Sequence, residues 1–189
     1  MKKLLAIALA LCMVLSIACF ASAESDDLIK VGIINNDPTE SGYRAANVAD
    51  MEKVFCEENG YDAQFFYSLK NEEQIAQAKK FISDEVDYLL LSAAATTGWD
   101  SVLKEAEDAG ITVILFDRTI DADESLYAAS VVSDMAKEGE TAVAWLAEQG
   151  LDEYNVIHIQ GVMGSAAQVG RSGALDTKVE ENDNWNIVI

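Results

Sequence analysis

The chain has 189 residues, of which 50% are hydrophobic, and it carries a formal net charge of −20 at pH 7. This apolar content is enough for a buried core and argues against a disordered chain. The acidic field repels phosphate backbones and anionic lipid surfaces, so we expect no nucleic-acid partner.

The N-terminal segment predicts export. Lys2 and Lys3 precede a long apolar run, and the small residues at 21–23 form a cleavage pattern, so residues 1–23 are predicted to be a signal peptide. Cys19 would mark a lipid anchor, but the usual upstream leucine is missing, so ordinary cleavage is favoured and anchoring stays an alternative. No later apolar run reaches the ~20 residues of a membrane span. We therefore expect a soluble protein in the periplasm or on the extracytoplasmic face of the cell membrane.

Beyond this segment, strand and helix patterns alternate with short connections. This alternation predicts an α/β fold with a mostly parallel sheet that is covered on both faces. The predicted strands are Ile29–Asn35, Tyr61–Tyr67, Val86–Leu91, Ile111–Phe116, Tyr127–Val132, Asn155–Ile159 and Asn186–Ile189. Several of them are continuous apolar runs, as is typical of strands in a parallel sheet.

Amphipathic helices are predicted between these strands. The first is expected to stop at Asn59–Gly60, Asn71 is expected to cap the second, and Gly110 is expected to close the third. The fourth and fifth helices are predicted at about 134–149 and 165–180.

Polar loops follow four of the predicted strands, at the edge where open α/β sheets bind ligands. The loops carry the sequences NNDPTESGYRAAN, SAAATTGWD, DRTID and QGVMGSAAQVGR, all rich in groups that can hydrogen-bond a polyol. Arg44 and Arg118 offer planar forks of donors, and Glu40 and Asp117 offer acceptors. Tyr43 offers an aromatic face for a sugar ring. On spacing alone, ordinary surface charges near helix starts remain the simpler interpretation.

Other candidate sites are weaker, and no cofactor or metal is predicted. QGVMGS at 160–165 matches neither the dinucleotide nor the P-loop pattern, so a plain turn is favoured over a phosphate site. DADES at 121–125 lacks the glycine and the distal glutamate of a calcium loop. His158 falls within a predicted strand and is interpreted as a core histidine. Cys56 is interpreted as a half-buried, unreactive thiol.

Two stretches carry a resemblance to a known family, ESGYRAAN at 40–47 and ATTGWDSVLKEAEDAGITVILFDRTID at 95–121. With weaker support at 133–139 and 159–171, the chain from residue 28 to 189 resembles the type I periplasmic sugar-binding proteins of ABC transporters, the ribose-binding-like group. The resemblance implies a periplasmic-binding-protein-like type I fold. Such a fold has a doubly wound parallel sheet in each of two lobes, which close over the ligand by hinge motion.

The resemblance also implies a function. It assigns the ligand-binding residues Glu40, Tyr43, Arg44, Asp117, Arg118 and Arg171. The protein would be a receptor without catalytic residues or cofactors, taking a pentose or hexose and delivering it to an ABC permease as a monomer. Two alternatives stay open: a sensor for a chemoreceptor or kinase, and, less favoured, a secreted carbohydrate-acting enzyme that uses Glu40 and Asp117.

The resemblance places an N-terminal lobe at 24–133 and the start of a second lobe at 134–189. Two lobes of ~100–150 residues each need a longer chain. The second lobe is therefore expected to be incomplete, and the sheet of the first lobe is expected to have an unpaired edge.

Overall fold

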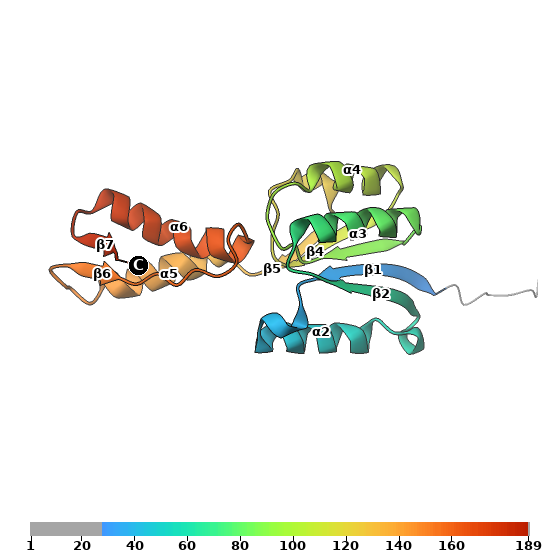
Figure 1. Cartoon of the computed structure of the whole chain (residues 1–189), viewed down its shortest axis with the longest axis horizontal. Coiled ribbons are helices and arrows are strands. Elements are labelled where there is room, and N and C mark those ends of the chain that lie inside the picture. Colours follow the sequence, from blue (N-terminus) through green and yellow to red (C-terminus); the bar gives the residue numbers. More distant parts are fainter. Residues whose placement is uncertain (1–27, 189) are drawn as a thin grey trace, which may run out of the picture.

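The structure is a computed structural model that describes residues 28–188, so the predicted signal peptide at 1–23 lies outside the described residues. Figure 1 shows two α/β units that are joined after strand β5. The first unit is a parallel sheet with the strand order β2-β1-β3-β4-β5. Its strands are β1 (Ile29–Asn35), β2 (Tyr61–Tyr67), β3 (Tyr88–Leu91), β4 (Thr112–Asp117) and β5 (Ala129–Val132).

Helices cover both faces of this sheet (Figure 1). They are α2 (Gly42–Val54) on one face, with α3 (Asn71–Ser83) and α4 (Asp100–Asp108) on the other. Successive strand residues point to opposite faces. Val31 and Ile33 of β1 accordingly pack in the core that includes Met51 of α2, while Ile34 packs in the larger core with Phe81 of α3.

A close approach of α3 to the sheet requires a glycine in β1. A Cβ atom at Gly32 would lie 2.6 Å from ring atoms of Phe81, which is itself buried. The absence of a side chain at this position therefore lets the aromatic ring rest directly on the strand.

The second unit is smaller. It contains α5 (Met135–Ala147), β6 (Tyr154–Val156), α6 (Ala166–Glu181) and β7 (Trp185–Ile187), and β6 and β7 pair in parallel. Its core is built on Tyr154 and Trp185, whose rings stack with centroids 4.0 Å apart, together with Leu175 of α6.

The predicted α/β class and parallel sheet are confirmed, and β1 and β2 have the predicted bounds. The other strands are shifted or shortened at their ends. On its outer side β5 has no partner among residues 28–188, and Val131 of this strand is 70% exposed. In the same part of the chain, no helix has the length and apolar character needed to cross a membrane.

Two local predictions were wrong. Lys70, not Asn71, occupies the N-cap position of α3, because the side chain of Asn71 donates to the carbonyl of Thr97 at 3.0 Å instead. The predicted strand Asn155–Ile159 ends at Val156, because β7 pairs with β6 only over Tyr154–Val156. His158 therefore lies in the loop after the strand and not in a core.

Helices α5 and α6 cross with their backbones in close contact. A Cβ atom at Gly139 would lie 2.5 Å from the carbonyl oxygen of Arg171, and one at Gly170 would lie 2.7 Å from Cβ of Met135. These two glycines therefore set the distance between the helices, and with it the position of Arg171.

We expect Gly139→Ala to lower the free energy of unfolding by about 1–3 kcal/mol, because the added methyl group must push the helices apart. Gly173→Ala is the matched control. It lies in α6, where an added Cβ atom meets nothing within 4 Å, so it should raise stability by about 0.5–1 kcal/mol through better helix propensity. Urea unfolding followed by tryptophan fluorescence measures both, and equal effects of the two substitutions would contradict the close-packing argument.

Candidate functional site

A cleft of ≈ 420 Å³ lies between the carboxyl ends of the first unit's strands and the loop that precedes α6. All six residues that the resemblance assigned to a ligand line this cleft, namely Glu40, Tyr43, Arg44, Asp117, Arg118 and Arg171. The structure thus brings together residues that are up to 131 positions apart in the chain. The cleft occupies the edge at which open α/β sheets bind ligands.

The turn between β1 and α2 positions the first of these residues. Asp37 caps a short 3₁₀ turn by accepting from the amide of Thr39 at 2.8 Å, and Ser41 caps α2 by accepting from the amide of Arg44 at 3.1 Å. Glu40 and Arg44 are four residues apart, and Arg44 Nε lies 3.2 Å from Glu40 Oε2. The local caps therefore hold an ion pair at the mouth of the cleft.

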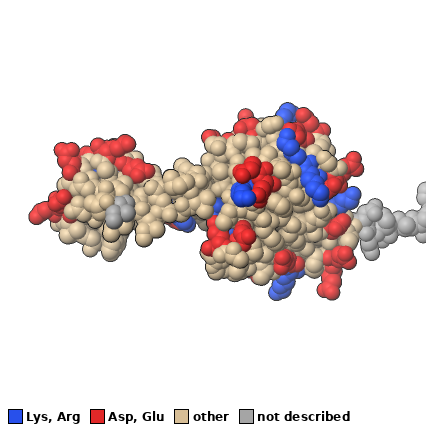
Figure 2. Space-filling model, viewed as in Figure 1, with Lys and Arg blue, Asp and Glu red and all other residues tan. Residues whose placement is uncertain are grey.

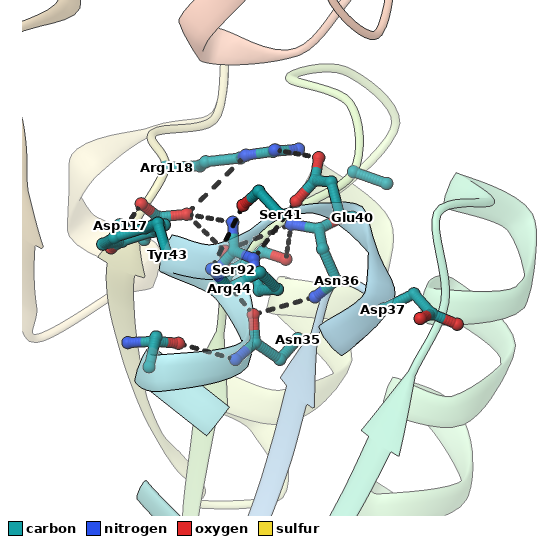
Figure 3. A network of polar contacts seen from close by, with 12 residues as sticks. Asn35, Asn36, Asp37, Glu40, Ser41, Tyr43, Arg44, Ser92, Asp117 and Arg118 are labelled. Atoms are coloured by element: carbon teal, nitrogen blue, oxygen red, sulfur yellow. Dashed lines mark hydrogen bonds and ion pairs between the residues drawn. The ribbon is translucent and has the colours of Figure 1, made fainter. Parts of the chain in front are cut away.

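Arg44 is the centre of the polar network in Figure 3. Its side chain is only 2% exposed. Besides Glu40, its guanidinium donates to Asn35 Oδ1 at 2.8 Å and to Asp117 Oδ2. One planar fork thus joins groups from the end of β1, the 3₁₀ turn and the end of β4.

Asp117 has an unusual backbone conformation. Its φ is +63°, in the left-handed region, and the amide of Arg118 donates to the carbonyl of Phe116 at 2.6 Å. This hydrogen bond defines a three-residue γ-turn around Asp117. Strained backbone of this kind persists where the surroundings hold it in place, and it concentrates at binding sites. The turn separates two neighbouring side chains so that both can reach the cleft.

The carboxylate of Asp117 has further partners. It accepts from the Tyr43 hydroxyl at 2.9 Å through Oδ1 and from Ser92 Oγ at 3.1 Å through Oδ2. Desolvation, and next the hydrogen bond to Asp117, raise the pKa of Tyr43 above its ordinary value of 10.0. The Tyr43 hydroxyl is therefore a protonated donor throughout the neutral range, while its ring is exposed.

Arg118 has one guanidinium nitrogen without a partner. Its Nη2 donates to Glu40 Oε1 at 2.7 Å, and the side chain is 8% exposed. Within residues 28–188, Nη1 is buried and makes no hydrogen bond. A buried donor left unsatisfied is costly, so this nitrogen is suited to meet an oxygen atom supplied from outside the protein.

The second unit supplies a different wall. Arg171 Nε donates to Glu138 Oε2 at 2.7 Å, and both side chains are about half exposed. His158 lines the cleft, so its interpretation as a core histidine was wrong, because the backbone leaves β6 before reaching it. Its Nε2 lies 3.3 Å from Ser172 Oγ, while its Nδ1 has no partner among the described residues.

The sequence analysis missed several polar residues of the cleft and its support: Asn35, Ser92, His158, Gln160, Gln168 and Ser172. Asn35, Ser92, Gln160 and Gln168 lie within the polar loops that the strand-end argument did select, but none of them was singled out as a ligand residue. Ser172, in α6, lies just outside these loops and carried no comparable signal.

The first wall of the cleft is balanced in charge. Two guanidinium groups, from Arg44 and Arg118, interlock with the carboxylates of Glu40 and Asp117. On the face in Figure 2, lysine and arginine side chains lie among those of aspartate and glutamate. No group of three or more metal-ligating side chains is present in 28–188. Such a wall is suited to a neutral ligand that is rich in hydroxyl groups.

Comparison with known proteins adds independent information. Residues 31–189 match the family described as periplasmic binding protein domain. The chain is 35% identical over 155 residues to the galactofuranose-binding protein YtfQ of Escherichia coli (strain K12), which covers 79% of this chain and 48% of that protein. The chain spans about half the length of the curated relatives that it matches.

Two solved structures have a similar fold. One, from Mycobacterium smegmatis in complex with β-D-fucofuranose, has a TM-score of 0.73 at 32% identity over 85% of this chain and 54% of its own. The other is the periplasmic binding protein component of the arabinose ABC transporter from Shewanella sp. ANA-3, bound to α- and β-L-arabinofuranose. It has a TM-score of 0.70 at 30% identity over 84% of this chain and 53% of its own.

We expect Arg44→Met to lower the free energy of unfolding by about 3–5 kcal/mol, because it leaves buried acceptors without their cation. Lys79→Met is the control, since it breaks the exposed ion pair with Glu105 and should cost at most about 1 kcal/mol. Urea unfolding of both variants measures the difference. Similar losses in the two variants would show that the Arg44 network does not hold the first unit together.

Proposed function

The chain belongs to the periplasmic binding protein domain family, and from this premise we propose that its cleft binds a neutral monosaccharide. The protein acts as an extracytoplasmic receptor that delivers a pentose or hexose to an ABC permease. Its ligand-binding residues are Glu40, Tyr43, Arg44, Asp117, Arg118 and Arg171.

The unpartnered Nη1 of Arg118 is the observation that carries this proposal. The rest of the Arg118 side chain is fixed by Glu40 and is nearly buried, so the free N–H group cannot turn towards water without breaking that ion pair. A hydroxyl oxygen of a sugar would satisfy it. A hydrogen bond to a charged donor contributes more than a neutral one.

The other groups of the first wall fit the same ligand. Tyr43 presents an exposed ring to the same cleft, and the guanidinium of Arg44 lies 5.4 Å from the centre of that ring. An aromatic face packs against the C–H side of a sugar while neighbouring polar groups bind its hydroxyls. Glu40 and Asp117 are engaged by fixed donors, an arrangement that supports a receptor more than an enzyme.

The relatives favour the furanose ring form. The three related proteins named above bind galactofuranose, fucofuranose and arabinofuranose, and one of them belongs to an arabinose ABC transporter. By analogy, we assign residues 24–133 to a first lobe and 134–189 to the start of a second. The protein works outside the cytoplasm as a monomer.

Arg118→Met tests the site directly. Isothermal titration calorimetry with D-galactose, L-arabinose, D-fucose and D-fructose should detect binding of at least one sugar by the unaltered chain. The substitution should weaken that binding at least about tenfold, the effect of losing a hydrogen bond to a charged donor. Lys104→Met, on the exposed face of α4, should bind as the unaltered chain does. Equal affinity in the Arg118 variant would refute the assigned site, and a folded chain that binds none of the sugars would refute the function.

Two substitutions of Tyr43 separate the contribution of ring stacking to sugar affinity from the contribution of the hydroxyl group. Tyr43→Phe keeps the ring and loses only the hydrogen bond to Asp117, so most of the sugar affinity should remain. Tyr43→Ala removes the ring and should weaken binding about three- to tenfold. The same calorimetric titration compares the two variants, and indistinguishable affinities would argue against ring stacking.

A further inference from the structure

The two units contact each other through a backbone hydrogen bond made by Gly164, a residue that lies between the cleft-lining Val162 and Ser165 in the sequence. The amide of Thr96, in the loop after β3, donates to the carbonyl of Gly164 at 3.0 Å. Gly164 lies in the loop 157–165, which we call the bridging loop, between β6 and α6. Among the residues that the structure describes, this is the one hydrogen bond between the first unit (29–132) and the second (135–187). Its strength therefore bears directly on how the cleft opens.

Gln168, in the first turn of α6, makes two side-chain hydrogen bonds to the bridging loop. Its Oε1 accepts from the amide of Gly164 at 3.0 Å, and its Nε2 donates to Gln160 Oε1 at 2.7 Å. Its own amide donates to the cap Ser165 at 3.2 Å. This is a variant of the capping box, in which the side chain at the third helical position reaches back to the chain that enters the helix.

The loop on the opposite side is anchored as well. The carbonyl of Thr96 accepts from the amide of Asp121 at 2.7 Å, and the carbonyl of Thr97 accepts from the side chain of Asn71 at 3.0 Å. The hydrogen bond between the units thus joins two loops that are each fixed to their own unit. Gly164 is also at φ +78°, a conformation that glycine adopts without strain.

We infer that Gln168 is a positioning residue that sets how readily the cleft opens. By holding the amide of Gly164, it keeps the carbonyl of the same residue where the amide of Thr96 can reach it. The effect on ligand affinity rests on the proposed sugar-binding function, since a ligand bound between two walls is retained only while they are closed. The structural role itself does not depend on any ligand.

Amide hydrogen exchange, measured by NMR on the ligand-free chain, tests the structural role. In Gln168→Leu the bridging loop loses its anchor, so the amide of Thr96 should exchange faster. Gln168→Glu retains an oxygen acceptor for Gly164 and should keep most of the protection. Gln149→Leu is the matched control, because Gln149 is an exposed glutamine at the far end of α5, and it should leave the Thr96 amide unchanged.

The amides of β1 serve as an internal reference for global unfolding. If they also lose protection in Gln168→Leu, Gln168→Ala repeats the test without adding an apolar branch. If the Thr96 amide is as well protected in Gln168→Leu and Gln168→Ala as in the unaltered chain, the inference is overturned. Loss of protection in Gln168→Glu equal to that in Gln168→Leu would overturn it too, because the acceptor would then be irrelevant.

Sugar dissociation, followed by stopped-flow fluorescence, tests the functional consequence. Gln168→Leu should release the sugar about two- to tenfold faster, the range expected for one neutral hydrogen bond, and the control Gln149→Leu should release it at the original rate. Faster Thr96 exchange in a chain that binds no sugar would refute the sugar-binding proposal and leave the positioning role intact. If the chain binds sugar but Thr96 exchange is unchanged in Gln168→Leu, the positioning role is refuted and the sugar-binding proposal stands.

Discussion

The buried guanidinium of Arg44 is the interaction on which the first wall of the cleft depends. A charge that is removed from water must be matched by partners within hydrogen-bond distance, or its burial destabilises the fold. Asn35, Glu40 and Asp117 supply those partners from three separate segments. The end of β1, the turn before α2 and the end of β4 are therefore fixed relative to one another. The wall has its shape before any ligand arrives, so little ordering remains to oppose binding.

The two walls differ in how firmly they are held. The first wall contains charged side chains that are largely buried, and it is built on the ends of the sheet strands. The second is carried by a loop and a helix end, and apart from Arg171 its polar side chains are two amides, two hydroxyls and an imidazole. A ligand would first meet a rigid surface and then be covered by a more adaptable one. This division is consistent with binding by closure, in which contacts to both walls favour the closed state.

Much of the fold could be predicted from the sequence, because strands buried in a parallel sheet are apolar throughout. β1, in the interior of the sheet, had the predicted bounds for this reason. β2 also had the predicted bounds, although it is an edge strand in which Asp62 and Gln64 are exposed. The end of β6 could not be predicted, since it depends on how far β7 pairs with it. Strand-end position identified Asp117 and Arg118, but it did not reveal the left-handed backbone of Asp117. That conformation results from contacts with residues distant in the sequence, such as Ser92 and Arg44.

The left-handed conformation of Asp117 also limits how this position can change during evolution. At a positive φ, glycine is tolerated freely and asparagine better than most residues. Both are reached from an aspartate codon by a single base change, so the two mutations gentlest to the backbone are also among the most accessible. Each removes the carboxylate while leaving the γ-turn in place. The carboxylate is also a partner of the buried Arg44 guanidinium, so both changes suit the backbone but leave that charge short of an acceptor. Backbone conformation and ion pairing therefore act in opposite directions at this one position.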